Sequence, residues 1–140
     1  MTGGSLLLDT GPWVALIDRS DVAHETCCAF FEECHGQLLS TEAVMTEALH
    51  LLSGSAEAQR SCVEYVLRGA VALVPTTMET LRRSIDLVGQ YRSVPMDYAD
   101  ATLIVLAEVL DVGDVFTLDR RGFSVYRWKG RRGFHIHPGP

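Results

Sequence analysis

The chain has 140 residues, of which 47% are apolar, and a formal net charge of −6. This length and composition suit one folded domain, spanning 1–140, and exclude a disordered chain. The apolar stretches are too short to cross a membrane and no secretion signal opens the sequence, so we expect a cytoplasmic protein without membrane association.

The cysteines point to the same compartment. Cys27, Cys28, Cys34 and Cys62 show no paired spacing of the kind that binds zinc. Three of them fall in one predicted helix, where a thiol packs as a small apolar group. We therefore expect reduced thiols in an intracellular protein.

Apolar runs, cap residues and chain breakers predict alternating strands and helices in the first half of the chain. In order, the expected elements are a strand at 5–9, a short helix from Pro12 to about 17, a helix at 22–34 capped by Ser20 or Asp21, a strand at 37–40, a helix at 42–53 capped by Thr41, and a helix at 56–68.

The second half continues this alternation. The expected elements are a strand at 71–74, a helix capped by Thr76 or Thr77 that runs to about 91, a helix at 97–110, a strand at 115–118, an edge strand at 124–128, and an irregular basic tail at about 129–140. Strands separated by helices predict an α/β fold, in which a central, mainly parallel sheet is flanked by helices on both faces.

Five acidic residues occupy the ends of these elements or one face of a helix. Asp9 and Asp119 close predicted strands, Asp97 and Asp100 open an apolar helix, and Glu47 lies in the middle of a helix. The carboxyl ends of parallel strands meet at one edge of a sheet, which is the usual position of a binding site. Because crowded carboxylates repel one another unless a cation lies among them, this arrangement predicts a divalent metal site.

Each acid also has a purely structural interpretation. Asp9 and Asp119 suit helix N-caps or turns, and a single helical glutamate such as Glu47 usually faces solvent. Asp97 as the N-cap and Asp100 three residues later would both be stabilised by the helix dipole. The metal interpretation therefore depends on all the acids taken together, and the role of Asp97 as ligand or cap stays open.

Four segments together resemble the PIN-domain ribonucleases, especially the VapC-type toxins of toxin–antitoxin pairs. They are LLDTGP at 7–12, VMTEAL at 44–49, MDYADATLI at 96–104 and FTLDRRGF at 116–123. No single segment is specific, whereas their order and spacing are. The resemblance extends over about 6–128.

The resemblance implies a PIN-like fold and four catalytic, metal-binding acids: Asp9, Glu47, Asp100 and Asp119. It implies Mg²⁺ or Mn²⁺ as the cofactor and hydrolysis of RNA phosphodiester bonds. It also implies an antitoxin protein as partner and a homodimer. Asp97, Thr10 and Thr117 occupy supporting positions.

Basic residues gather at the end of the chain. Residues 1–119 hold all 18 acidic residues and six arginines, whereas 120–140 hold six basic residues and no acidic one. A basic margin beside an acidic centre suits a phosphate backbone, although a solvated tail is the other interpretation. The candidate RNA-binding residues are Arg120, Arg121, Arg127, Lys129, Arg131 and Arg132.

Three alternatives start from the same acids. A phosphatase of the haloacid-dehalogenase kind needs a second Asp two residues after Asp9, where this chain has Gly11. A response-regulator receiver needs a lysine after a late strand, and the single lysine here is Lys129. A non-catalytic PIN-like module would use the acidic groove only to bind a basic partner, and the sequence does not distinguish it from the nuclease.

Overall fold

Five strands form one sheet in the computed structural model, which describes residues 4–140. They are β1 (Leu6–Leu8), β2 (Leu38–Ser40), β3 (Val71–Leu73), β4 (Asp114–Phe116) and β5 (His135–His137). Their order across the sheet is β3-β2-β1-β4-β5, and every neighbouring pair is parallel.

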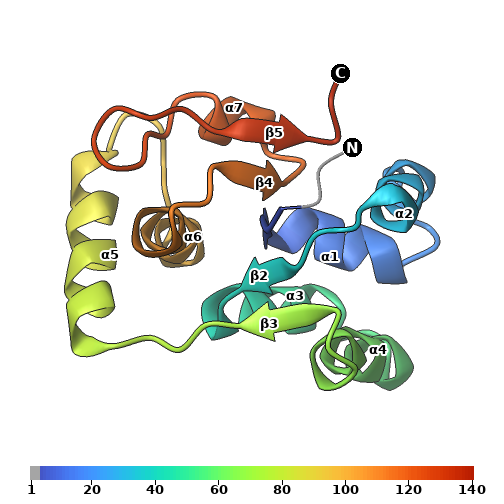
Figure 1. Ribbon diagram of the computed structural model, residues 1–140. Helices are drawn as coiled ribbons and strands as arrows, with labels where there is room; N and C mark the ends of the chain where they lie inside the picture. The colour runs from blue at the N-terminus through green and yellow to red at the C-terminus, as the bar shows by residue number, and fades with distance from the viewer. Residues whose placement is uncertain (1–3) are drawn as a thin grey trace.

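Seven helices connect the strands within residues 4–140. They are α1 (Thr10–Ile17), α2 (His24–Glu33), α3 (Glu42–Leu51), α4 (Ala56–Leu67), α5 (Met78–Gln90), α6 (Tyr98–Leu110) and α7 (Arg120–Phe123). In Figure 1, α5 and α6 lie to the left of the sheet, and α1, α2 and α4 lie to its right. The predicted α/β fold, with a parallel sheet between helices, is confirmed.

Polar caps fix the start of several helices, as the sequence indicated. The side chains of Thr41 and Thr77 accept hydrogen bonds from backbone N–H groups in the first turns of α3 and α5. The predicted cap of α2 is wrong. Its N-cap is Ala23, which has no side-chain hydrogen bond, and Asp21 instead closes the preceding turn by accepting from the Ala23 N–H at 2.9 Å.

The predicted edge strand at 124–128 is also wrong. Val125 and Tyr126 both donate backbone hydrogen bonds to the Gly122 carbonyl, and Trp128 forms only an isolated bridge with Arg132. The last strand is β5, which pairs in parallel with β4 and lies inside the segment expected to be irregular. A parallel neighbour needs a crossover, and the chain between β4 and β5 makes one through α7 and the following turns.

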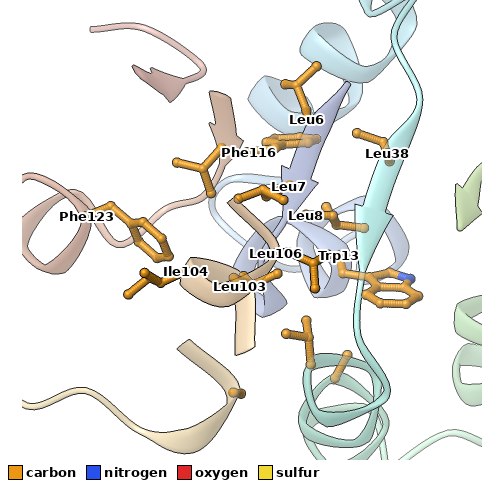
Figure 2. Packing of buried hydrophobic residues seen from close by; sticks show 14 of the residues in the cluster. Leu6, Leu7, Leu8, Trp13, Leu38, Leu103, Ile104, Leu106, Phe116 and Phe123 are labelled. Atoms are coloured by element: carbon orange, nitrogen blue, oxygen red, sulfur yellow. The ribbon is translucent and has the colours of Figure 1, made fainter. Parts of the chain in front are cut away.

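The core surrounds the central strand. Leu6, Leu7 and Leu8 of β1 are all 0% exposed, because β1 has a neighbour on each side and helices over its faces. Figure 2 shows these three leucines with residues from the adjacent strands and from α6: Leu38, Phe116, Leu103, Ile104 and Leu106. Full burial of one such side chain contributes about 1.5–3 kcal/mol to stability, so the three leucines anchor β1 firmly.

The sheet reverses its order between β1 and β4. The chain adds β2 and β3 on one side of β1, then returns to place β4 and β5 on the other side. Leu8 pairs with Phe116, and the Asp9 N–H donates to the Phe116 carbonyl at 3.0 Å. Segments that follow these two strands therefore meet at the switch point, where open α/β sheets bind their ligands.

Two smaller expectations concern the cysteines and the membrane. All four cysteines are free thiols, and Cys27 and Cys62 are buried. None of the helices in residues 4–140 has the length and apolar character needed to span a membrane.

Candidate functional site

Asp9 and Asp119 meet at the switch point and are joined by Thr117. Asp9 is only 6% exposed, and its Oδ1 accepts a hydrogen bond from the Thr10 N–H at 2.8 Å. Its Oδ2 accepts from the Thr117 hydroxyl at 2.6 Å. The same hydroxyl oxygen accepts from the Asp119 N–H at 2.9 Å. Thr117 therefore orients the Asp9 carboxylate and fixes the backbone of Asp119.

Glu47 joins this group through Thr10. The Thr10 hydroxyl donates to Glu47 Oε1 at 2.6 Å, which links the first residue of α1 to the middle of α3. Glu47 is half-buried. The glutamate is therefore turned toward the switch point, and the solvent-facing interpretation of Glu47 does not hold.

Asp97 and Asp100 begin α6 and cap it together. Asp97 Oδ1 accepts from the Asp100 N–H at 2.8 Å, and Asp100 Oδ2 accepts from the Asp97 N–H at 3.3 Å. Asp119 caps α7 in a similar way, since its Oδ1 accepts from the Gly122 N–H at 2.9 Å. The second carboxylate oxygen of Asp119 has no hydrogen-bond partner in the part of the chain that the structure describes, whereas the Asp97 and Asp100 side chains lie close enough to share a hydrogen bond when one of them is protonated.

Burial and mutual repulsion make this cluster electrostatically unfavourable. Burial raises the pKa of Asp9 to about 6, and repulsion from Asp119 and Glu47 adds to the effect. Burial also raises the pKa of Asp100 to about 8, with further repulsion from Asp9 and Asp97. No lysine, arginine or histidine within residues 4–140 forms an ion pair with any of the five acids.

The donor chemistry of this pocket fits a hard divalent cation. Carboxylate oxygens are the ligands that Mg²⁺ and Mn²⁺ prefer, and within residues 4–140 no cationic side chain forms an ion pair with these acids. The fit in space is incomplete, however. Over the described residues, no three His, Cys, Asp or Glu side chains form a group that could hold a metal ion as they are placed. Binding would therefore require these side chains to draw closer together.

The basic residues near the end of the chain have mostly structural contacts. The Arg120 side chain donates to the Pro138 carbonyl, and Arg127 Nη1 donates to three successive carbonyls, those of residues 124–126. Lys129 Nζ forms an ion pair with Asp111 Oδ1 at 2.8 Å. Arg132 Nη1 lies 3.6 Å from the same oxygen.

The other two cations have no such contacts. In residues 4–140, neither Arg121 nor Arg131 has an ion pair or a side-chain hydrogen bond, and both are exposed. RNA binding by the six basic residues stays a prediction. Among them, Arg121 and Arg131 have side chains available for a ligand.

Tyr126 lies near the acidic cluster formed by Asp9, Glu47, Asp97, Asp100 and Asp119, and it was missed by the sequence reasoning. Its side chain is 0% exposed, and its hydroxyl donates to the Pro95 carbonyl at 2.9 Å. Burial raises the pKa of Tyr126, and the nearby charges of Asp100 and Asp119 raise it further. The residue lies in the segment misread as an edge strand, where alternating apolar residues gave no sign of a site.

The fold and the site define an α/β domain with a cluster of carboxylates at the switch point of a parallel sheet. The PIN domain family model matches residues 6–129, and the chain belongs to this family. The chain is similar to Ribonuclease VapC26 of Mycobacterium tuberculosis, with 24% identity over 135 residues that cover 95% of this chain and all of that protein.

A solved structure agrees with this assignment of the fold. The crystal structure of Mycobacterium tuberculosis VapC20, a Sarcin-Ricin loop cleaving toxin, superposes with a TM-score of 0.73. The match covers 79% of this chain and 86% of VapC20, with 16% sequence identity. The resemblance inferred from the four sequence segments is thus confirmed at the level of family and fold.

Proposed function

We propose that this protein is a metal-dependent ribonuclease, with Mg²⁺ or Mn²⁺ as cofactor, and that it is the toxin of a toxin–antitoxin pair. One observation carries the proposal: Asp9, Glu47, Asp100 and Asp119 come from four separate segments and lie close enough to repel one another, and none of them has an ion pair within residues 4–140. Membership of the PIN domain family and the similarity to a ribonuclease support the choice of reaction.

The residues of the pocket divide into two kinds. The four acids would hold the metal, which, when bound, activates water and neutralises the charge on the leaving oxygen of the cleaved phosphodiester. Thr10 and Thr117 position them, since Thr10 donates to Glu47 and Thr117 contacts both Asp9 and the Asp119 backbone. Asp97 supports Asp100 through the shared cap of α6.

Proton release should accompany metal binding. The pKa of Asp9 is raised to about 6 and that of Asp100 to about 8, so near neutral pH the cluster retains a proton mainly on Asp100. A metal ion competes with these protons because only the ionised carboxylates bind it well. Metal affinity is therefore expected to increase as the pH rises from about 6 to 8.

RNA is expected to approach over α7. Arg121 lies two residues after Asp119 and its guanidinium has no ion pair in residues 4–140, so it can contact a phosphate beside the pocket. Arginine suits this role because its planar group binds phosphate oxygens in pairs. The remaining basic residues add long-range attraction even where they have structural contacts.

The proposed protein partners are an antitoxin and a second copy of this chain. Met78, Leu81 and Ile85 of α5 are 76%, 43% and 59% exposed, and their spacing places them along one face of the helix. An exposed apolar stripe of this kind is typical of a protein interface. The stripe supports the presence of a partner but does not distinguish the two.

The proposal is tested by incubating the purified protein with RNA in Mg²⁺ or Mn²⁺ and in a chelator. Cleavage should require the metal and be lost in Asp9→Asn and Asp100→Asn, whereas Asp86→Asn, an equal change on the exposed face of α5, should remain active. Absence of RNA cleavage in every condition would support the non-catalytic module, in which the acids only bind a basic partner and which the incomplete metal geometry also favours. Release of phosphate from small phosphoesters would support a phosphatase.

A further inference from the structure

Tyr126 connects two parts of the chain that carry pocket acids. Its backbone N–H donates to the Gly122 carbonyl at 3.0 Å, which attaches it to α7 just after Asp119. Its hydroxyl donates to the Pro95 carbonyl at 2.9 Å, two residues before Asp97 begins α6. The hydrogen bond thus joins segments 31 residues apart in the sequence.

The ring of Tyr126 is held firmly in place. It packs edge-to-face against Tyr91 and Phe123, with each pair of ring centroids 5.3 Å apart, and no part of the residue is exposed. Because the ring is fixed by these contacts, the hydroxyl oxygen is fixed as well. It therefore defines where the Pro95 carbonyl, and with it the start of α6, can lie.

The other side of the hydroxyl faces the Asp119 carboxylate across Gly122. A Cβ placed on Gly122 would lie 3.0 Å from the Tyr126 hydroxyl oxygen and would collide with Asp119 Oδ2. The two oxygens therefore lie against the same bare Cα. This close approach explains why the position is occupied by glycine.

We propose that Tyr126 is a positioning residue of the acidic pocket: its hydroxyl sets the separation between Asp119 on α7 and the Asp97–Asp100 cap of α6. This inference rests on the proposed function for its catalytic consequence. The structural part is independent of it, since the connection through Pro95 exists whether or not the pocket binds metal.

The test compares Tyr126→Phe with Tyr91→Phe. The first change removes the hydroxyl bonded to Pro95 and keeps the ring. The second removes the hydroxyl of Tyr91, whose ring packs against Tyr126 and which, within residues 4–140, accepts from the Arg127 N–H alone, at 3.1 Å. Amide hydrogen exchange at 97–101 should become at least several-fold faster in Tyr126→Phe and remain unchanged in Tyr91→Phe.

Metal binding is the second measurement. Loss of an outer contact to a metal site costs about 10-fold or more in affinity. The Mn²⁺ concentration that gives half of the thermal stabilisation, and half of the RNA cleavage, should therefore increase about 10-fold in Tyr126→Phe. The cleavage rate at saturating Mn²⁺ should change little. Lower thermal stability with an unchanged Mn²⁺ midpoint would show a merely structural role and overturn the proposal.

Each failure has a distinct signature. Absence of RNA cleavage by the unmodified protein refutes the proposed nuclease, while hydrogen exchange and Mn²⁺-induced stabilisation still decide the role of Tyr126. Unchanged exchange at 97–101 refutes the connection whatever the nuclease result. If Tyr126→Phe does not fold, Gly122→Ala crowds the Tyr126 hydroxyl, because its Cβ would lie 3.0 Å from that oxygen, and unchanged exchange at 97–101 in that variant overturns the proposal.

Discussion

Replacing Asp9 by Asn should abolish activity and yet stabilise the metal-free protein at neutral and alkaline pH. Burial raises the pKa of Asp9 from 3.8 to about 6. An acid with a higher pKa in the folded state binds its proton more tightly there than in the unfolded chain. The stability of the metal-free protein must then decrease as the pH rises from about 4 to 6.

The size of the effect follows from the two pKa values. A difference of two pKa units corresponds to about 3 kcal/mol lost above pH 6, because each unit is worth about 1.4 kcal/mol. Asparagine avoids this loss since it carries no charge at any pH. It retains the oxygen that accepts from the Thr10 N–H but loses the one that accepts from the Thr117 hydroxyl, which costs about 1 kcal/mol.

The net gain for Asp9→Asn is therefore about 2 kcal/mol at pH 8, or roughly 8 °C in Tm for a domain of this size. Thermal unfolding in a chelator, followed by circular dichroism at pH 4 and pH 8, measures it. At pH 4 the gain should disappear and the variant should be slightly less stable than the unmodified chain. A variant that is equally destabilised at both pH values would refute the assignment of Asp9 as a buried, uncompensated charge.

Further changes test neighbouring contacts. In the chelator, the unmodified protein should lose stability between pH 5 and pH 8, and excess Mg²⁺ or Mn²⁺ should restore it; an equal effect of the metal at both pH values would contradict the linkage to Asp9 and Asp100. Thr117→Val removes the hydrogen bond that lowers the pKa of Asp9, so the rise of cleavage with pH should move to higher pH, as a pH–rate profile would show. Arg121→Ala should weaken RNA binding and reduce its salt dependence by about one ion, as measured by titration at several salt concentrations. Arg127→Ala serves as the contrast. Because the Arg127 side chain donates to three carbonyls, this change should lower the Tm. A loss of RNA binding without a change in Tm would mean that Arg127, and not Arg121, is the residue that binds RNA.

The sequence predicted the elements whose signals are local. Strand β1 is three consecutive leucines, α6 opens on Asp97 and continues through a long apolar run, and both were expected at nearly their observed positions. Strand β5 was missed because His135–His137 is short, follows Gly133 and precedes a proline. Its existence depends on parallel pairing with β4, which leaves no periodic pattern in three residues. Tyr126 was missed for a similar reason, since its partner Pro95 is remote in the sequence.

The grouping of the acids was predictable because four of the five also have a local structural role at the start of a helix. Asp9, Asp97 and Asp119 are helix N-caps in the structure, and Asp100 completes the cap of α6. The cap role and the metal-binding role are compatible, because a carboxylate has two oxygens. In all three of Asp97, Asp100 and Asp119 one oxygen accepts a cap hydrogen bond, and in Asp119 the other oxygen has no partner in the described residues.

Capping therefore contributes to the pocket instead of competing with it. A cap hydrogen bond fixes the rotation of the carboxylate, and the positive end of a long helix such as α6 partly offsets the repulsion among the acids. Glu47 lies within α3 and has no cap to hold it, and here the Thr10 hydroxyl supplies the hydrogen bond that the helix ends supply elsewhere. The strand ends bring the acids to one edge of the sheet, and the cap hydrogen bonds at the helix starts fix the orientation of their carboxylates. Both consequences follow from the alternation of strands and helices that the sequence specifies.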